Sequence, residues 1–283
     1  MTDWESLLQK IINGQEFSSA IQTNGFYKSD IGFKQFAKQH GFSPDLNTPM
    51  YLSLDFWSLQ PKILTENNFY ILRSGRGTFA IIDETQFPKS YLDLSTQNYT
   101  QLEIKKNDEF SELIKAFDTR QENAGLEHLH VLGVYDLLIK ELFGDVEWHI
   151  GPRGNKVSQF KVYGKKTSEE TALLFDYHGQ EELDYTLWTK DCILLFEAKV
   201  VEHENEGLDI GWFKMAYPAL RFSKIDNYTI KPIYFLRWEN TIHLFVFPKF
   251  QFYNDGIIIN NKKNQIPEKI LRIDYSSTLQ DFL

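Results

Sequence analysis

The stretch Glu181–Val200, EELDYTLWTKDCILLFEAKV, decides the fold of this chain. Its second half is the unbroken apolar run Cys192–Phe196, which ends in Glu197, Ala198 and Lys199. Its first half, Leu183–Trp188, is rich in aromatic, β-branched and aliphatic residues, and polar residues separate the two halves. This pattern predicts a β-hairpin that is buried on both faces and carries acids and a lysine at one end.

The register of this hairpin can be predicted from its turn. If the turn is centred on Lys190 and Asp191, Asp184 lies opposite Glu197, and Glu182 lies opposite Lys199. Cross-strand partners have Cβ atoms about 5 Å apart, so three carboxylates and one ammonium should meet at one corner of the sheet. Two opposed carboxylates repel each other, and a divalent cation would compensate them. Oxygen ligands favour Mg²⁺, with Mn²⁺ as the alternative.

Asp184, followed after twelve residues by Glu197-Ala198-Lys199, resembles the PD-(D/E)xK motif of many type II restriction endonucleases and related nucleases. Leu183 stands where that motif often has proline. The resemblance implies that Asp184 and Glu197, helped by the Ala198 carbonyl, bind the metal. It implies that Lys199 orients or helps activate the attacking water and stabilises the pentacovalent phosphate. Glu182 would be a further ligand or a partner for Lys199.

The resemblance covers roughly residues 126–248 and implies further contacts with DNA. In this family a helix after the ExK strand often directs basic or amide side chains toward the site. Lys214, Tyr217 and Arg221 fall on one face of the helix predicted over residues 211–225, in which Pro218 should cause a kink. Their assignment to DNA binding rests on position alone.

A glycine-rich turn, Arg73-Ser-Gly-Arg76-Gly77, supplies two more candidates for DNA binding. Such a turn can approach a phosphate closely, and arginine can form bidentate hydrogen bonds to it. The turn lacks the spacing and the lysine of a P-loop. A plain hairpin turn is the alternative interpretation of Arg73 and Arg76.

An acid from the preceding helix often joins the site in the same family. Residues 126–143 form the strongest helical pattern in the chain, and Glu127 is a slightly better candidate than Glu122. A solvated charge on the helix surface is the simpler explanation for either residue. His178 precedes the hairpin and could contact phosphate, although a lone histidine is more often structural.

Composition limits the classes of protein to which the chain can belong. It has 283 residues, 42% of them hydrophobic and 24% charged, as in globular proteins. It has no apolar run of membrane-spanning length, and its single cysteine, Cys192, fits a reducing cytoplasm. We therefore expect a cytoplasmic protein without a membrane partner. The net charge of −9 argues against a general polyanion binder, so a nuclease would need a local basic cleft.

The remaining pattern predicts the order of elements. Helices are expected at 2–13, with Thr2 as N-cap, and at 30–40; strands are expected at 50–57, 67–83, 146–150, 171–178, 231–238 and 242–247, with Gly179 in a turn. The polar stretch 98–125 suggests an N-terminal subdomain over 1–120, which could be DNA-reading or ordinary, and a nuclease core over 121–283. The expected fold class is α/β or α+β, a restriction-endonuclease-like mixed sheet flanked by helices.

The function expected from the resemblance is Mg²⁺-dependent hydrolysis of phosphodiester bonds in double-stranded DNA by a restriction-type endonuclease. A repair or structure-specific nuclease of the same fold is one alternative. A non-catalytic binding or scaffold protein, with a structural cluster of acids and lysine, is the other. A C2 homodimer is the default expectation for an enzyme that cuts both strands.

Overall fold

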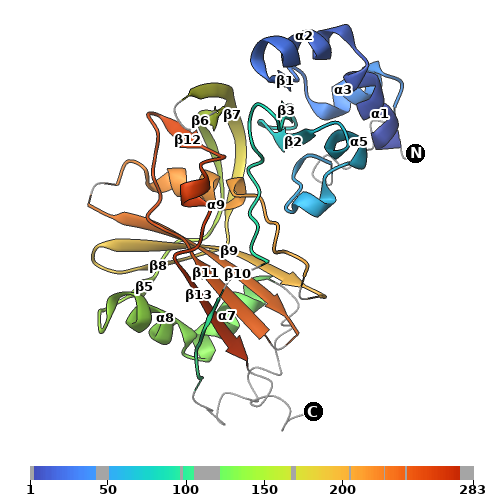
Figure 1. The fold of residues 1–283 in the computed structure, drawn as a ribbon. Helices are drawn as coiled ribbons and strands as arrows, with labels where there is room; N and C mark the ends of the chain where they lie inside the picture. The colour runs from blue at the N-terminus through green and yellow to red at the C-terminus, as the bar shows by residue number, and fades with distance from the viewer. Residues whose placement is uncertain are drawn as a thin grey trace.

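The computed structural model describes residues 3–42, 51–95, 98–104, 122–166, 170–203, 205–225, 227–239 and 241–274, and it has a mixed α+β fold (Figure 1). Its strands form three sheets. The largest has seven strands in the order β4-β13-β11-β10-β9-β8-β5, and two smaller sheets have the orders β1-β3-β2 and β12-β6-β7. The general class expected from the sequence is therefore confirmed.

The elements follow one another with these bounds. The N-terminal module, defined as the described residues up to 95, contains α1 Asp3–Ile12, α2 Gln15–Asn24, β1 Phe26–Lys28, α3 Phe33–Gln39, η1 Trp57–Leu59, α5 Lys62–Thr65, β2 Phe69–Arg73 and β3 Phe79–Asp83. Then come β4 Thr100–Gln101, α7 Glu122–Val131, α8 Val134–Phe143, β5 His149–Ile150, β6 Gly154–Lys165, β7 Thr171–Leu183, β8 Tyr185–Trp188 and β9 Cys192–Val201. The last are α9 Phe213–Ala219, η2 Leu220–Phe222, β10 Thr229–Trp238, β11 Thr241–Val246, β12 Gly256–Ile258, η3 Lys262–Asn264 and β13 Lys269–Asp274.

The predicted hairpin is the antiparallel pair β8–β9. Tyr185 pairs with Phe196, and Trp188 pairs with Ile193, which is the register predicted from the sequence. The turn forms where the Thr189 hydroxyl accepts hydrogen bonds from the Asp191 and Cys192 backbone amides. Strand β9 is central because β10 pairs with it in parallel on its other side. A parallel neighbour requires a crossover connection, and the crossover between β9 and β10 contains α9.

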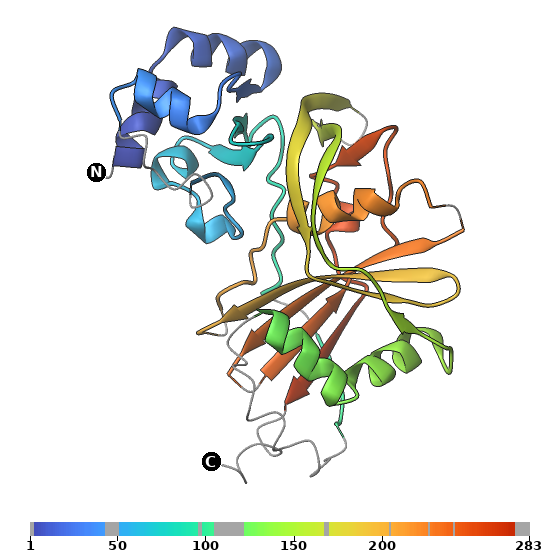
Figure 2. The ribbon, with the colours of Figure 1, turned by 180° about the vertical axis from the view of Figure 1, so that it is seen from behind.

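Helices cover both faces of the large sheet. Figure 2 shows α7 and α8 lying along one face, where residues such as Leu129 and Tyr135 pack on Leu194 and Phe196. The opposite face of β9 carries Ile193 and Leu195, which belong to the cluster that contains α9. Alternation along the strand therefore places Glu197 and Lys199 on the α9 side of the sheet.

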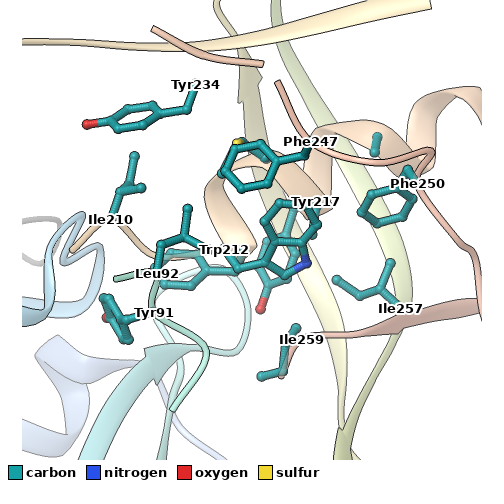
Figure 3. Packing of buried hydrophobic residues seen from close by; sticks show 14 of the residues in the cluster. Tyr91, Leu92, Ile210, Trp212, Tyr217, Tyr234, Phe247, Phe250, Ile257 and Ile259 are labelled. Atoms are coloured by element: carbon teal, nitrogen blue, oxygen red, sulfur yellow. The ribbon is translucent and has the colours of Figure 1, made fainter. Parts of the chain in front are cut away.

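The apolar core on the α9 side joins the N-terminal module to the rest of the chain. Figure 3 shows the Trp212 indole among side chains that include Tyr91, Leu92, Phe247 and Phe250. Trp212 is fully buried, and its backbone amide donates a hydrogen bond to the Ser90 carbonyl. Because this cluster contains residues from both sides of the predicted boundary at residue 120, the two parts pack as one body there. Residue 120 itself lies outside the described residues.

The N-terminal module also has a core of its own. Helices α1 and α3 pack with β2 and β3 around residues such as Leu7, Phe33, Ile71 and Phe79. Three isolated bridges among the described residues connect the module to the body of the protein, Phe56 with Ile210, Tyr91 with Gly211, and Gly75 with His178. The bridge between Gly75 and His178 fixes the glycine-rich turn against β7.

Four details of the predicted element order are wrong. Residues 126–143 are not one helix, because Gly133 adopts a left-handed conformation (φ 69°) between α7 and α8. The predicted strand over residues 50–57 is absent from its described part, where residues 51 and 52 are helical and Trp57 begins η1. Gly179 is not in a turn, because it lies inside β7 opposite Ser158. Helix α9 begins only at Phe213, and Pro218 lies in its last turn before η2.

Two expectations about the chain as a whole can be compared with the structure. Across the described ranges, no helix combines the length and the apolar character needed to span a membrane. Cys192 is buried and forms no disulfide bond, and burial raises the pKa of its thiol to about 12. The predicted N-cap Thr2 lies outside the described residues.

Candidate functional site

Asp184 lies at the point where the chain passes from one sheet to another. It separates β7, which belongs to the β12-β6-β7 sheet, from β8 in the large sheet. Its Oδ2 atom accepts a hydrogen bond of 2.8 Å from the backbone amide of Ala198, past the last β8–β9 pair. Burial, together with the nearby charge of Glu197, raises the pKa of Asp184 to about 7.

Glu197 and Lys199 project from the same face of β9 and are both buried. Glu197 is only 3% exposed, and Lys199 is 8% exposed. The Lys199 ammonium lies 3.1 Å from Glu197 Oε1 and donates a hydrogen bond of 2.8 Å to Glu122 Oε1. Glu122 is the first residue of α7, so this contact connects the start of the helix to the strand. Asp184 and Glu197 therefore meet near Lys199, as the sequence predicted.

Two further residues of the site come from elements outside the hairpin. Lys214 on α9 has its ammonium 3.7 Å from Glu197 Oε1 and 3.1 Å from Asp55 Oδ1. Asp55 also approaches Lys199, with 3.5 Å between Oδ2 and Nζ. Its backbone is fixed because its carbonyl accepts a hydrogen bond of 2.7 Å from the Gly211 amide. Sequence reasoning missed Asp55, which lies in a segment that carries no recognisable motif.

These six residues form what we call the lysine–carboxylate cluster. It contains four acids and two lysines: Asp55, Glu122, Asp184, Glu197, Lys199 and Lys214. Burial alone would lower the pKa of Lys199, but the charges of Glu197, Asp55 and Glu122 raise it well above its ordinary value. The pKa of Lys214 is raised for the same reason, against the effect of its own burial. Both lysines therefore stay charged at neutral pH.

The donors of the cluster suit a hard divalent cation. When all four acids are ionised they outnumber the two ammonium groups, so the cluster has an excess of negative charge. Asp184 and Glu197 offer carboxylate oxygens, and the Ala198 carbonyl faces the same side as its amide, toward Asp184. Within the described ranges, no three His, Cys, Asp or Glu side chains are grouped closely enough to hold an ion by themselves. A cation here would therefore use two carboxylates, the carbonyl and ligands from outside the chain.

A cavity of about 380 Å³ opens beside the cluster. Its walls include Glu197 and Lys214 from the cluster, together with Arg73 and Glu182. Tyr217 also contributes to the wall, and its buried hydroxyl has no hydrogen-bond partner in the described part of the chain. The cavity brings residues of the N-terminal module and of α9 to the same space.

Glu182 does not lie where the predicted register put it. The β8–β9 ladder ends at Tyr185 and Phe196, and Glu182 is an exposed residue of β7 opposite Asn155. The predicted pairing with Lys199 is therefore wrong, because the chain changes sheets at Asp184. Glu182 still reaches the cavity wall.

The remaining predicted residues divide between the cavity and other contacts. Arg73 lines the cavity, whereas Arg221 is held by Glu181, with 2.7 Å between Nε and Oε1. Glu127 forms an ion pair of 2.7 Å with Arg153, so Glu122 and not the favoured Glu127 is the helix acid that joins the cluster. The side-chain role predicted for His178 stays a prediction.

One comparison with known proteins places the chain in a family. Residues 87–265 match a family described as Domain of unknown function (DUF6997). The chain belongs to this family. The matched segment contains Asp184, Glu197, Lys199 and Lys214 but begins after Asp55. Searches of curated proteins and of solved structures returned no match.

Proposed function

We propose that the lysine–carboxylate cluster is the active site of a Mg²⁺-dependent endodeoxyribonuclease that hydrolyses phosphodiester bonds in double-stranded DNA. The observation that carries this proposal is that Asp184, at the junction of β7 and β8, lies beside Glu197 and Lys199 on β9. Asp184 accepts a hydrogen bond from the Ala198 amide. Glu197 and Lys199 flank Ala198 on β9, and their side chains form an ion pair. The acid, the second acid and the lysine thus stand together in the order of a PD-(D/E)xK site.

The arrangement of elements supports the finer fold proposal, a restriction-endonuclease-like core. Helices α7 and α8 precede the strand that leads to Asp184, β9 carries the Glu-Ala-Lys sequence, and α9 leads to β10 beside it. This is the order of elements expected from the resemblance. A restriction-type role in the cytoplasm and a C2 dimer are parts of the same proposal and rest on family analogy.

The state of each side chain suggests its role in hydrolysis. In the reaction, a water oxygen bonds to phosphorus while the bond from phosphorus to the leaving sugar oxygen breaks, the attacking water gives a proton to solvent, and the leaving oxygen takes one from solvent. Lys199 keeps its proton, so it acts as a cationic hydrogen-bond donor to the phosphate oxygens or the water and not as a base. Lys214 supplies a second positive charge at the cavity wall. Asp184 and Glu197 would hold Mg²⁺, which supplies Lewis-acid chemistry when bound.

Cleavage of supercoiled plasmid DNA is the direct test. The wild-type protein is incubated with Mg²⁺, Mn²⁺ or EDTA beside Lys199→Ala and the control Lys190→Ala, which changes an exposed lysine in the hairpin turn. We expect metal-dependent nicking or linearisation by the wild type and the control, and its loss in Lys199→Ala. Discrete bands would indicate a sequence-specific enzyme, and a preference for branched DNA would indicate a structure-specific one.

The competing function is that of a non-catalytic protein in which the cluster is purely structural. The observation that favours it is that both lysines are already paired with acids. This alternative predicts no cleavage of varied and methylated DNA and no Mg²⁺ or Mn²⁺ binding that depends on Asp184 and Glu197. Those two results together would overturn the nuclease proposal.

A further inference from the structure

A second cavity, of about 590 Å³, adjoins the one beside the cluster. The two cavities share two wall residues, Ser53 and Arg73. The second cavity lies between the start of α3 and the turn that connects β2 to β3, so the N-terminal module alone forms its walls. The shared residues place the two cavities next to each other, with Ser53 and Arg73 at their boundary.

The charge of this second cavity differs from that of the protein as a whole. Its walls carry the cations Lys34, Arg73 and Arg76 and no acidic residue, although the chain has a net charge of −9. Lys34 and Arg76 are exposed. None of the three cations forms an ion pair with an acid anywhere in the described ranges. Three cations without an ion-pair partner in the described ranges, around one cavity whose walls carry no acid, attract an anion with several charges.

The backbone of the turn is held firmly from both sides. The Arg76 amide donates a hydrogen bond of 2.8 Å to the His178 carbonyl on β7, and the Gly77 carbonyl accepts one of 2.6 Å from the Phe33 amide on α3. Gly75 is required at this contact, because a Cβ atom there would lie 2.9 Å from the His178 carbonyl oxygen. The turn therefore presents its arginines from a fixed backbone.

The side chain of Arg73 is also oriented. Its Nε donates a hydrogen bond of 3.0 Å to the Gly75 carbonyl within the same turn. This bond uses one guanidinium nitrogen and leaves the two terminal nitrogens as donors at the boundary between the cavities. A planar group with paired donors suits a phosphate oxygen pair.

We propose that Lys34, Arg73 and Arg76 form an anion subsite that binds the phosphodiester backbone of a DNA strand whose scissile phosphate lies beside Glu197 and Lys214. The proposal rests on the proposed function and deepens it, because it assigns the N-terminal module the task of holding substrate. It also explains how a protein of net negative charge binds DNA, since the cations are concentrated at one place. Contacts of this kind fix the position of the strand and carry no sequence information.

The test measures binding separately from cleavage. Fluorescence anisotropy of a labelled duplex, with Ca²⁺ in place of Mg²⁺ and at several salt concentrations, compares the wild type with Lys34→Ala/Arg76→Ala. The control, Lys38→Ala/Lys62→Ala, removes the same charge from exposed positions of the same module that line neither cavity. We expect Kd to rise about 10-fold or more in the first variant. The slope of log Kd against log salt concentration should fall by an amount equivalent to about two phosphate contacts, and the control should change little in either quantity.

The outcomes separate this inference from the proposed function. If DNA binding falls in Lys34→Ala/Arg76→Ala but the wild type neither cuts DNA nor binds Mg²⁺ or Mn²⁺ through Asp184 and Glu197, the anion subsite stands and the nuclease proposal fails. If the wild type cuts DNA in a Lys199-dependent manner but both double variants bind like the wild type, the subsite is refuted. Equal losses in the two double variants would also overturn it, because they would reflect overall charge. A wild type that binds no duplex overturns it as well.

Steady-state kinetics add a second readout if the protein cuts DNA. A subsite remote from the bond that breaks contributes equally to ground-state and transition-state binding, so its loss raises KM and leaves kcat unchanged. Loss of kcat in Lys34→Ala/Arg76→Ala would contradict a role limited to holding the strand.

Discussion

The Asp55 carboxylate lies 3.1 Å from the Lys214 ammonium, although Asp55 belongs to the N-terminal module and Lys214 to α9. The Asp55 carbonyl also accepts a hydrogen bond from Gly211, at the start of the segment that leads into α9. Backbone and side chain thus hold the two elements together at the edge of the cluster. Asp55 is 27% exposed at its side chain, so the contact is only partly open to solvent.

We expect Asp55→Asn to lower DNA cleavage about 10-fold or more. The substitution keeps the size of the side chain and the backbone bond but leaves Lys214 and Lys199 without one of their counter-charges, which alters their positions and the field at the phosphate. Asp209→Asn is the control, because Asp209 lies at the same junction and bonds the Ser58 amide without contacting either lysine. Equal activity in Asp55→Asn and wild type, measured by initial cleavage rates, would show that Asp55 has no part in the site.

Glu122→Gln and Glu127→Gln should differ in their effects on cleavage. Glu122 accepts the hydrogen bond from Lys199 and helps to position its ammonium, so its substitution should lower kcat about 10-fold or more. Glu127 pairs with Arg153, whose side chain is 53% exposed, and its loss should cost less than about 1 kcal/mol of stability. Single-turnover rates and urea unfolding measure the two effects. A larger loss of rate in Glu127→Gln would reverse the assignment.

Arg221→Ala should destabilise the fold by about 3 kcal/mol, because it leaves the buried Glu181 carboxylate with the Ser158 hydroxyl as a hydrogen-bond donor but without a counter-charge. The Glu181 side chain is 2% exposed and that of Arg221 is 12% exposed, and the arginine also donates to the Glu181 carbonyl. Chemical denaturation measures the change. A double variant, Glu181→Leu/Arg221→Met, should recover most of the loss, since no buried charge remains. If Arg221→Ala and the wild type were equally stable, Arg221 would not be needed to neutralise Glu181, and the DNA contact predicted for it from the sequence would be the better explanation.

Acid should destabilise the protein partly through His243. Burial, with the charge of Arg272, lowers the pKa of His243 to about 4 from its ordinary 6.5, so the unfolded chain binds more protons between these values. The stability contributed by neutral His243 is therefore complete above about pH 6.5 and is lost as pH falls toward 4. His243→Phe keeps an aromatic ring beside Trp238 and cannot take a proton. Its free energy of unfolding should fall less steeply than that of the wild type over this range, and parallel curves would contradict the prediction.

Local rules were enough to predict the hairpin that carries the site. The polar Thr189–Asp191 turn and the apolar runs around it determine the β8–β9 register, so Asp184 and Glu197 could be placed together from sequence. The same rule failed for Glu182, because it assumes that a strand continues, and the chain instead enters another sheet at Asp184. No periodicity marks such a change.

Long-range contacts account for what the sequence did not predict at the site. Asp55 reaches the lysines through backbone pairing with residues 210 and 211, and no local pattern indicates a pairing so distant in the chain. The choice between Glu122 and Glu127 depended on where α7 begins and ends. Gly133 divides the predicted long helix into α7 and α8, and helix boundaries of this kind are difficult to locate from pattern alone.

Asp55 lies outside the family segment, so the segment alone does not encode the whole lysine–carboxylate cluster. Residues 87–265 carry both lysines of the cluster, but Asp55, one of the two carboxylates that contact both of them, is encoded upstream. A graft of the segment alone into another protein would leave Glu197 as the one carboxylate, among the described residues, that contacts both Lys199 and Lys214, so the repulsion between the two ammonium groups would be less well compensated. Recombination that separates the family segment from the upstream part of the N-terminal module would therefore remove one of the six residues of the cluster.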